Sequence, residues 1–378
     1  MELRVARLRT FLAVDPSNSN LACELADALI AQGGYADAWS QLNALPDDAK
    51  RDAGVRFRLA RCELVQGRYA DAEATLRALQ SDGHHSAAVS HDLAFSQLCQ
   101  HRAEDALTTA QDALDRFGGE LSLLVLKARS AMVLGRYPLA LASLDEALAL
   151  DASHVEALGV RALALLDAGE LDAAGAACRE CLHRDPDQHE ALIVAGTLAL
   201  WQRDAHTARE LFQRALNRHP ASGRALSGLG QAHMLLNQLP IANQVLDAAV
   251  QAMPGHIGTW HALAWVQLLQ GDIDAAERSY RHAYDIDRNF GETHGGLALI
   301  EALRGRHEES DALIKRALRL DPNSVTARYA RTLVLEARGQ SAEAEAAMQE
   351  LLSGSTAGTL PVHEFAAGLK ALLSRQQH

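Results

Sequence analysis

One pattern recurs ten times along this chain. A copy runs from Leu134 to Asp151 and reads LGRYPLALASLDEALALD, in which a glycine precedes an apolar stripe with spacings of three and four residues. Such spacings are typical of an amphipathic helix whose apolar side is buried. The turn position held by the glycine recurs every thirty-four residues, at Gly33, Gly67, His101, Gly135, Gly169, Arg203, Asn237, Gly271, Gly305 and Gly339. The pattern therefore predicts a series of helix–turn–helix units of constant length.

Two further positions keep small side chains in the same register. Five residues after the turn position, nine units have alanine and one has Ser310. Seven residues before it stand Ala26, Ala60, Ala94, Ala128, Ala162, Gly196, Gly230, Ala264, Ala298 and Thr332. A period of thirty-four residues built from two helices is the signature of tetratricopeptide repeats. The chain resembles this family over nearly its whole length.

The resemblance implies an all-α fold, a right-handed α-solenoid known as the tetratricopeptide superhelix. We call the two helices of each repeat helix A and helix B. The predicted organisation is a half-repeat capping helix within residues 1–16, ten repeats within 19–358 and a C-terminal capping helix within 359–378. Pro46 is expected to end the first helix B near Leu45 and to leave Pro46–Lys50 as a loop. The initial half repeat fits either a natural single-helix cap or a longer protein divided at that point.

The composition favours a protein partner over nucleic acid. The chain has 36 Lys+Arg against 48 Asp+Glu, a formal net charge of −12, whereas a nucleic-acid binder needs a basic stripe. With 48% hydrophobic but only 4% aromatic residues, alanine and leucine carry the packing, as in Ala/Leu/Arg-rich bacterial proteomes. No apolar run approaches the roughly 18–20 residues of a membrane span, and the first ten residues lack a signal-peptide core. We expect a cytoplasmic protein, or a periplasmic or envelope-associated one if a leader was removed.

One motif resembles a metal site. Cys178, Cys181 and His183 lie close together with His189 nearby, and thiolates and imidazoles bind zinc. Both cysteines, however, occupy positions that hold leucine and alanine one repeat earlier, so we interpret them as small core side chains. No His-Glu-x-x-His, Gly-rich phosphate loop or Gly-x-Ser-x-Gly motif occurs. The sequence therefore predicts no metal, no cofactor and no enzyme activity.

In the tetratricopeptide family, helix A lines the inner surface of the superhelix, so the resemblance implies a partner-binding groove there. The predicted groove residues are Phe57, Arg61, His91, Phe95, Val125, Arg129, Leu163, Ile193, Thr197, Trp201, Gln231, His261, Trp265 and Tyr329. A second row, with Met132, Leu166, Leu200, Met234, Leu235, Leu268 and Leu269, either extends this surface or packs between neighbouring A helices. The lysines and asparagines with which some members clamp a C-terminal carboxylate are missing.

The sequence thus predicts a non-catalytic scaffold or adaptor that binds a peptide or helix of a partner protein in this groove. The alternative is the regulatory or substrate-recruiting portion of a larger enzyme or of an envelope or secretion assembly, such as sulfotransferase, glycosyltransferase or polysaccharide machinery. Self-association through the terminal repeats is a third prediction. Fold alone does not choose among these functions.

Overall fold

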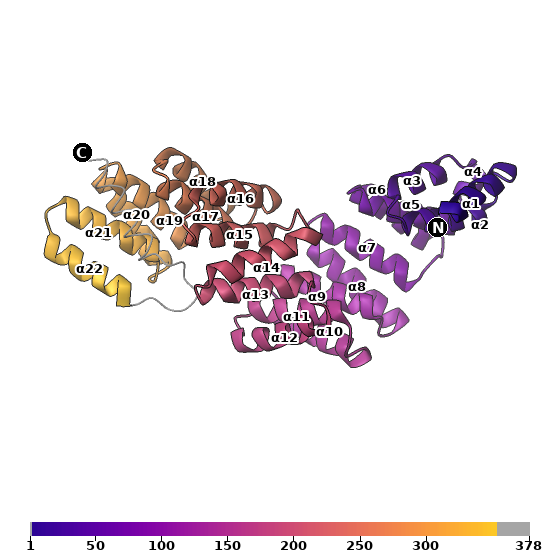
Figure 1. Cartoon of the computed structure of the whole chain (residues 1–378), viewed down its shortest axis with the longest axis horizontal. Coiled ribbons are helices and arrows are strands. Elements are labelled where there is room, and N and C mark those ends of the chain that lie inside the picture. The colour runs from indigo at the N-terminus through magenta and orange to yellow at the C-terminus, as the bar shows by residue number, and fades with distance from the viewer. Residues whose placement is uncertain (1, 354–378) are drawn as a thin grey trace. The chain divides into compact units, whose positions relative to one another are not determined.

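The computed structural model describes residues 2–353, and every regular element in that range is a helix (Figure 1). The chain divides into two compact units, Met1–Arg184 and Asp185–His378. Unit 1 contains α1 (Glu2–Val14), α2 (Ser19–Ile30), α3 (Tyr35–Asn43), α4 (Asp47–Lys50), α5 (Ala53–Val65), α6 (Tyr69–Ser81), α7 (Ala87–Cys99), α8 (Ala103–Phe117), α9 (Leu121–Val133), α10 (Tyr137–Leu150), α11 (Val155–Asp167) and α12 (Leu171–Arg184). The predicted all-α fold is confirmed.

Unit 2 continues with the same helix pairs. It contains α13 (His189–Trp201), α14 (Ala205–Arg218), α15 (Gly223–Leu235), α16 (Leu239–Ala252), α17 (Ile257–Leu269), α18 (Ile273–Ile286), α19 (Gly291–Leu303), α20 (His307–Leu320), α21 (Val325–Ala337) and α22 (Ser341–Ser353). The A helices are α2, α5 and then the odd-numbered helices from α7 to α21. Several begin at a side-chain cap: Asn18 accepts a hydrogen bond from the Leu21 amide at 3.0 Å, and Ser86 accepts one from Val89 at 3.2 Å. Such caps satisfy amides that the first helical turn leaves unpaired.

Each A helix is joined to its B helix by a turn residue in the left-handed region. All seven glycines at the turn position have positive φ, between 68° at Gly135 and 83° at Gly169. The three exceptions to glycine adopt the same conformation, with φ of 61° at His101, 63° at Arg203 and 56° at Asn237. The repeat therefore imposes one turn geometry even where the residue disfavours it.

The first repeat departs from the others at Pro46. Its helix B, α3, ends at Asn43 after nine residues, whereas α6 and α8 have thirteen and fifteen. The prediction that Pro46–Lys50 forms a loop is wrong, because Asp47–Lys50 is a short helix, α4, with Pro46 as its N-cap. Asp47 and Asp48 lie in its first turn, where acidic side chains stabilise a helix. The predicted cap in residues 359–378 lies outside the described residues.

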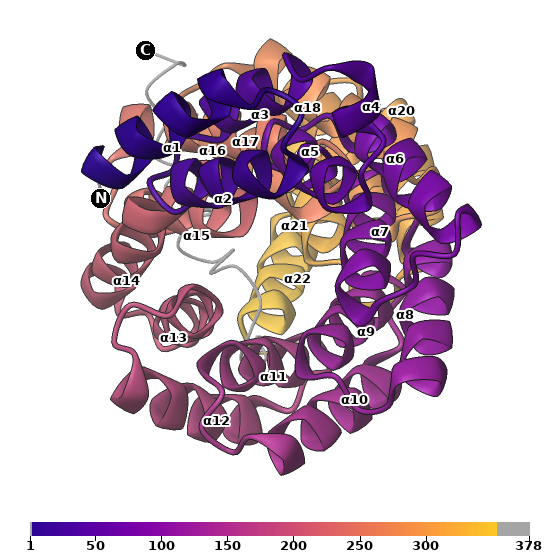
Figure 2. The ribbon, with the colours of Figure 1, turned by 90° about the vertical axis from the view of Figure 1, so that its right-hand side faces the viewer.

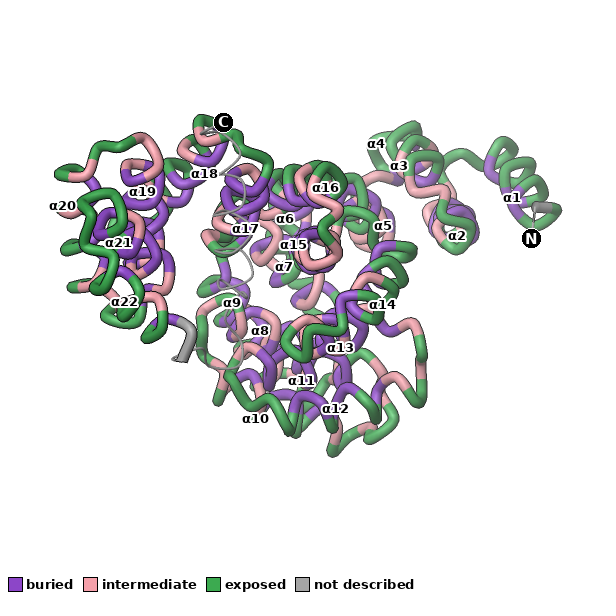
Figure 3. Tube along the Cα trace, turned by 60° about the vertical axis from the view of Figure 1, so that its left-hand side comes forward, coloured by how far each residue is buried: buried purple, intermediate pink, exposed green. Residues whose placement is uncertain are grey.

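Buried residues lie where paired helices face each other, and the connecting turns are mostly exposed (Figure 3). In unit 2, glycines on the A helices make room for large side chains from the B helices. A Cβ atom on Gly228 would lie 2.2 Å from the ring of Phe212, and one on Gly196 would lie 2.8 Å from the same ring. Phe212 is fully buried as a result. Gly230 serves the same purpose, because a Cβ atom there would lie 2.5 Å from the Leu246 side chain of α16.

Glycine also brings two consecutive A helices close together near the end of unit 2. A Cβ atom on Gly295 of α19 would lie 2.7 Å from the Ala327 nitrogen of α21. This approach lets the Glu292 carboxylate accept hydrogen bonds from the backbone amides of Val325, at 2.6 Å, and Thr326, at 3.3 Å. Helix α21 is therefore capped by a side chain of the preceding repeat.

Candidate partner-binding surface

Within each unit the A helices form one continuous layer. In unit 1, α7, α9 and α11 follow one another along one side, while α8, α10 and α12 lie along the other (Figure 2). Consecutive A helices also contact each other, α5 with α7, α7 with α9 and α9 with α11. In unit 2, α13 contacts α15, α15 contacts α17 and α19 contacts α21. Helix A side chains therefore either pack between repeats or project from this layer.

Five of the predicted groove residues are buried and present no exposed anchor to a partner. Their exposed fractions are 2% for Val125, 8% for Leu163, 4% for Ile193, 2% for Trp265 and 1% for Tyr329. The expectation that they line an open groove is corrected here, because these apolar side chains pack between neighbouring helices. Trp265 and Tyr329, for example, belong to one buried cluster with Leu299.

His261, another predicted groove residue, joins two repeats. Its Nε2 atom lies 2.9 Å from the Thr293 hydroxyl of α19, and its ring packs against Tyr280 and Phe290 at centroid distances of 5.4 and 5.6 Å. Burial lowers the pKa of His261 to about 4, with a smaller contribution from His256. The imidazole is therefore neutral at physiological pH and serves as a contact between α17 and α19.

Three predicted groove residues of unit 2 remain, and only one of them has a large exposed side chain. The Thr197 hydroxyl donates to the Ile193 carbonyl at 2.8 Å, and the Gln231 amide group lies 3.4 Å from both the carbonyl and hydroxyl oxygens of Ser227. Trp201, at the end of α13, is 37% exposed. Within residues 185–353 it is the only large hydrophobic side chain of an A helix with more than about a third of its surface exposed.

Unit 1 retains more of the predicted surface. Phe95 on α7 is 38% exposed, Arg61 on α5 is exposed, and Phe57, His91 and Arg129 are half-buried. Two residues that the sequence reasoning missed lie on the same helices: Val65 at the end of α5, 58% exposed, and Val133 at the end of α9, 68% exposed. We call these seven residues the unit 1 A-helix face.

The charged groups on this face are linked to neighbouring carboxylates. Arg61 Nε lies 3.7 Å from Asp92 Oδ2, and the other oxygen of Asp92 lies 3.0 Å from His91 Nδ1. Arg129 Nη2 lies 3.1 Å from Glu156 Oε1. The result is an apolar centre, Phe95, with an arginine on the A helix to either side.

The two cysteines of the motif that resembled a metal site lie in the interior, whereas His183 is exposed. Cys178 is 2% exposed and Cys181 is fully buried, and the Cys181 thiol lies 3.5 Å from the Val155 carbonyl. Among residues 2–353, no three His, Cys, Asp or Glu side chains come together in a way that could hold a metal ion. The same part of the chain contains no helix that is both long and apolar enough to cross a membrane.

Paired helices in constant register, joined by left-handed turns, define an all-α repeat protein. Sequence models of tetratricopeptide repeats match residues 23–86, 125–189 and 304–358, residues 199–266, and residues 257–290. The chain belongs to the tetratricopeptide repeat family. The comparison with curated proteins found no match.

Several solved structures share the fold at low sequence identity. The human IFIT1 dimer with m7Gppp-AAAA is 15% identical, with a TM-score of 0.55 over 89% of this chain and 90% of that chain. A monomeric IFIT1 mutant with Gppp-AAAA is also 15% identical, with a TM-score of 0.54 over 89% and 91%. A tetratricopeptide repeat protein from Parabacteroides merdae is 16% identical, with a TM-score of 0.45 over 62% and 93%. At these identities the likeness concerns the fold.

Proposed function

We propose that this chain is a non-catalytic interaction scaffold that binds a segment of a partner protein on the unit 1 A-helix face. One observation carries the proposal: Val65, Phe95 and Val133 remain exposed on three consecutive A helices. Single exposed apolar side chains are ordinary on protein surfaces. Here three such side chains lie in one layer of helices and have arginines beside them. This arrangement matches the apolar centre and charged rim of an interface.

A protein partner fits this face better than RNA does. The solved IFIT1 structures contain RNA-type ligands, so RNA is the competing class. Affinity for RNA depends on cations that neutralise phosphates, and the net charge here is −12. The two arginines on the face already lie near Asp92 and Glu156. Burial of Phe95 and the two valines would instead supply the main driving force for a polypeptide.

The same face would serve the alternative role, recruitment of a substrate or regulator within a larger enzyme or an envelope or secretion assembly. In that role the chain itself performs no chemistry, and the partner segment belongs to the assembly. We propose a bacterial, cytoplasmic setting on composition alone. The binding step is identical in both roles, so one experiment addresses it.

The test is a displayed peptide library selected on the parent chain, followed by fluorescence anisotropy with the selected peptides. We expect Phe95→Ala and Val133→Ala each to weaken binding about tenfold, the effect of removing a central anchor. The matched control is Leu150→Ala, since Leu150 is 55% exposed but lies on a B helix, α10. The parent should not bind PPP-AAAA, the ligand of another solved structure of human IFIT1.

Two results would overturn the proposal. One is a set of selected peptides that bind Phe95→Ala and Val133→Ala as tightly as the parent. The other is PPP-AAAA binding that these two substitutions weaken, which would assign the face to RNA.

A further inference from the structure

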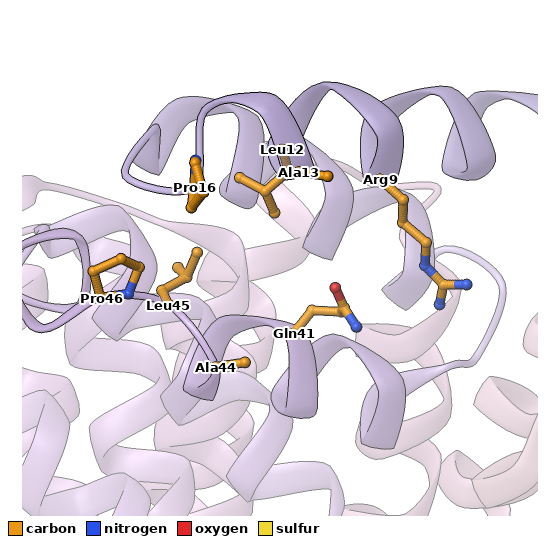
Figure 4. Close-up of a pocket in the computed structure, with 8 residues that line it drawn as sticks. All are labelled: Arg9, Leu12, Ala13, Pro16, Gln41, Ala44, Leu45 and Pro46. Carbon is orange, nitrogen blue, oxygen red and sulfur yellow. The ribbon is translucent and has the colours of Figure 1, made fainter.

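A second site lies away from the A-helix face, in a pocket of about 220 Å³ between α1 and α3 (Figure 4). Leu12 and Ala13 of α1 line one wall, and Leu45 and Pro46, which follow α3, line the other. The pocket covers the last turn of α3, where Gln41 lies, and the residues that follow the end of this helix at Asn43. The early end of this helix B, which Pro46 prevents from continuing, therefore leaves the space open.

The chemistry of the pocket differs between its two ends. The Arg9 guanidinium and the Gln41 amide lie toward one end, and the proline rings lie toward the other, with Leu12 and Leu45 between them (Figure 4). Leu12 and Leu45 are 8% and 6% exposed, so the floor is apolar and firmly packed. The pocket thus offers an apolar floor next to a cation and an amide.

The two polar side chains at this end of the pocket can donate further hydrogen bonds. Arg9 Nη2 lies 3.9 Å from Asp37 Oδ2, and both side chains are largely exposed, at 48% and 71%. An exposed ion pair at this distance contributes little and leaves guanidinium N–H groups to donate to another acceptor. The Gln41 amide makes no hydrogen bond to the described part of the chain.

We propose that this pocket binds one aliphatic side chain of a partner polypeptide together with an adjacent carboxylate. Its volume is below the roughly 300–1,000 Å³ of pockets that enclose a small-molecule ligand, so it suits a single side chain and the group beside it. The side chain packs on Leu12 and Leu45, while Arg9 and Gln41 donate to the carboxylate. The occupant is therefore acidic near its anchor, and the site is independent of the A-helix face.

The test uses N-acetyl-leucine as the probe and N-acetyl-leucinamide as its uncharged counterpart, titrated into the full chain with labelled leucine and alanine methyl groups. N-acetyl-leucine should shift the NMR signals of Leu12, Ala13, Ala44 and Leu45 with millimolar, saturable affinity, as expected for so small a ligand. The amide should bind about two- to fivefold more weakly, the usual effect of one exposed charge pair. Arg9→Gln should remove that difference, whereas Arg4→Gln, a change on the same helix but outside the pocket, should keep it.

A second variant blocks the space without removing the charge. Ala13→Leu should fill the pocket and abolish the shifts, and Ala6→Leu, at another exposed alanine of α1, should leave them unchanged. The proposal is overturned if N-acetyl-leucine causes no saturable shifts at these methyl groups, if the amide binds equally well, or if Ala13→Leu binds as the parent does. None of these outcomes depends on Phe95 or Val133. A failure of this proposal is therefore distinguishable from a failure of the proposed function.

Discussion

In each repeat, one residue at the turn position sets the backbone conformation that joins helix A to helix B. Gly135 has a φ of 68°, and a Cβ atom there would meet nothing within 4 Å, so the need for glycine is purely conformational. His101 occupies the same conformation at a φ of 61°, where an L-residue is strained. The ten turns therefore share one backbone conformation, but the free energy needed to adopt it differs between glycine and the other residues.

We predict that Gly135→Ala destabilises the chain by about 1 kcal/mol and that His101→Gly stabilises it by about 0.5 kcal/mol, since glycine removes the strain but loses more entropy on folding. Thermal and urea unfolding followed by circular dichroism measure both. Gly255→Ala is the control, because this glycine has no positive φ and a Cβ atom added there would meet nothing within 4 Å. Equal effects for all three substitutions would contradict the role given to the turn.

Gly228 matters for a different reason, the space it leaves to Phe212. We predict that Gly228→Ala costs about 1–3 kcal/mol, because a Cβ atom 2.2 Å from the ring overpacks the core. The double variant Gly228→Ala with Phe212→Leu should recover part of that loss relative to the sum of the single changes. Unfolding measurements on the four proteins give the coupling, and a value near zero would refute the contact.

At the scale of helices, the sequence located the elements closely because the repeat is periodic. A period of thirty-four residues counted from Ser19 places the next two repeats at Ala53 and Ala87, and these three residues are the first of α2, α5 and α7. The sequence does not predict the short helix α4, because Pro46 indicates the end of one helix, whereas in the structure it is also the N-cap of the next. A periodic sequence predicts the helices that all repeats share, but it does not predict a helix that occurs in one repeat only.

Helices α17 and α19 are joined by the half-buried, neutral His261. A histidine whose folded pKa is lowered to about 4, from 6.5, disfavours protonation in the native state. The stability that this neutral state contributes is complete above pH 6.5 and is lost as the pH falls toward 4. At about 1.4 kcal/mol per pKa unit, the loss approaches 3 kcal/mol.

We predict that the free energy of unfolding of unit 2 falls over this pH window and that His261→Gln reduces the slope, because glutamine can bond to Thr293 without titrating. Urea unfolding at several pH values between 4 and 7 measures it. His85→Gln, a change at an exposed histidine, should keep the parent slope. An unchanged slope in His261→Gln would mean that other groups carry the pH dependence.

At the scale of the whole molecule, position within the repeat proved insufficient to predict which A-helix side chains are exposed. Trp265 and Leu299 occupy the same position in consecutive repeats, and both are buried in one cluster. At that position in unit 1, charged and apolar residues alternate, as Arg61, Phe95 and Arg129, and Phe95 stays 38% exposed. The exposed fraction of such a side chain therefore depends on the side chains of the neighbouring repeat that pack against it. These contacts are known only from the three-dimensional structure.

The central claim is that a partner polypeptide covers the unit 1 A-helix face. The most direct measurement is carbene footprinting of the chain with and without a selected peptide, read out by mass spectrometry for individual side chains. We predict that labelling of Phe57, Phe95 and Val133 falls on binding, while labelling of Leu150 on α10 stays constant. Unchanged labelling of Phe95 and Val133 with protection of Leu150 would contradict the account.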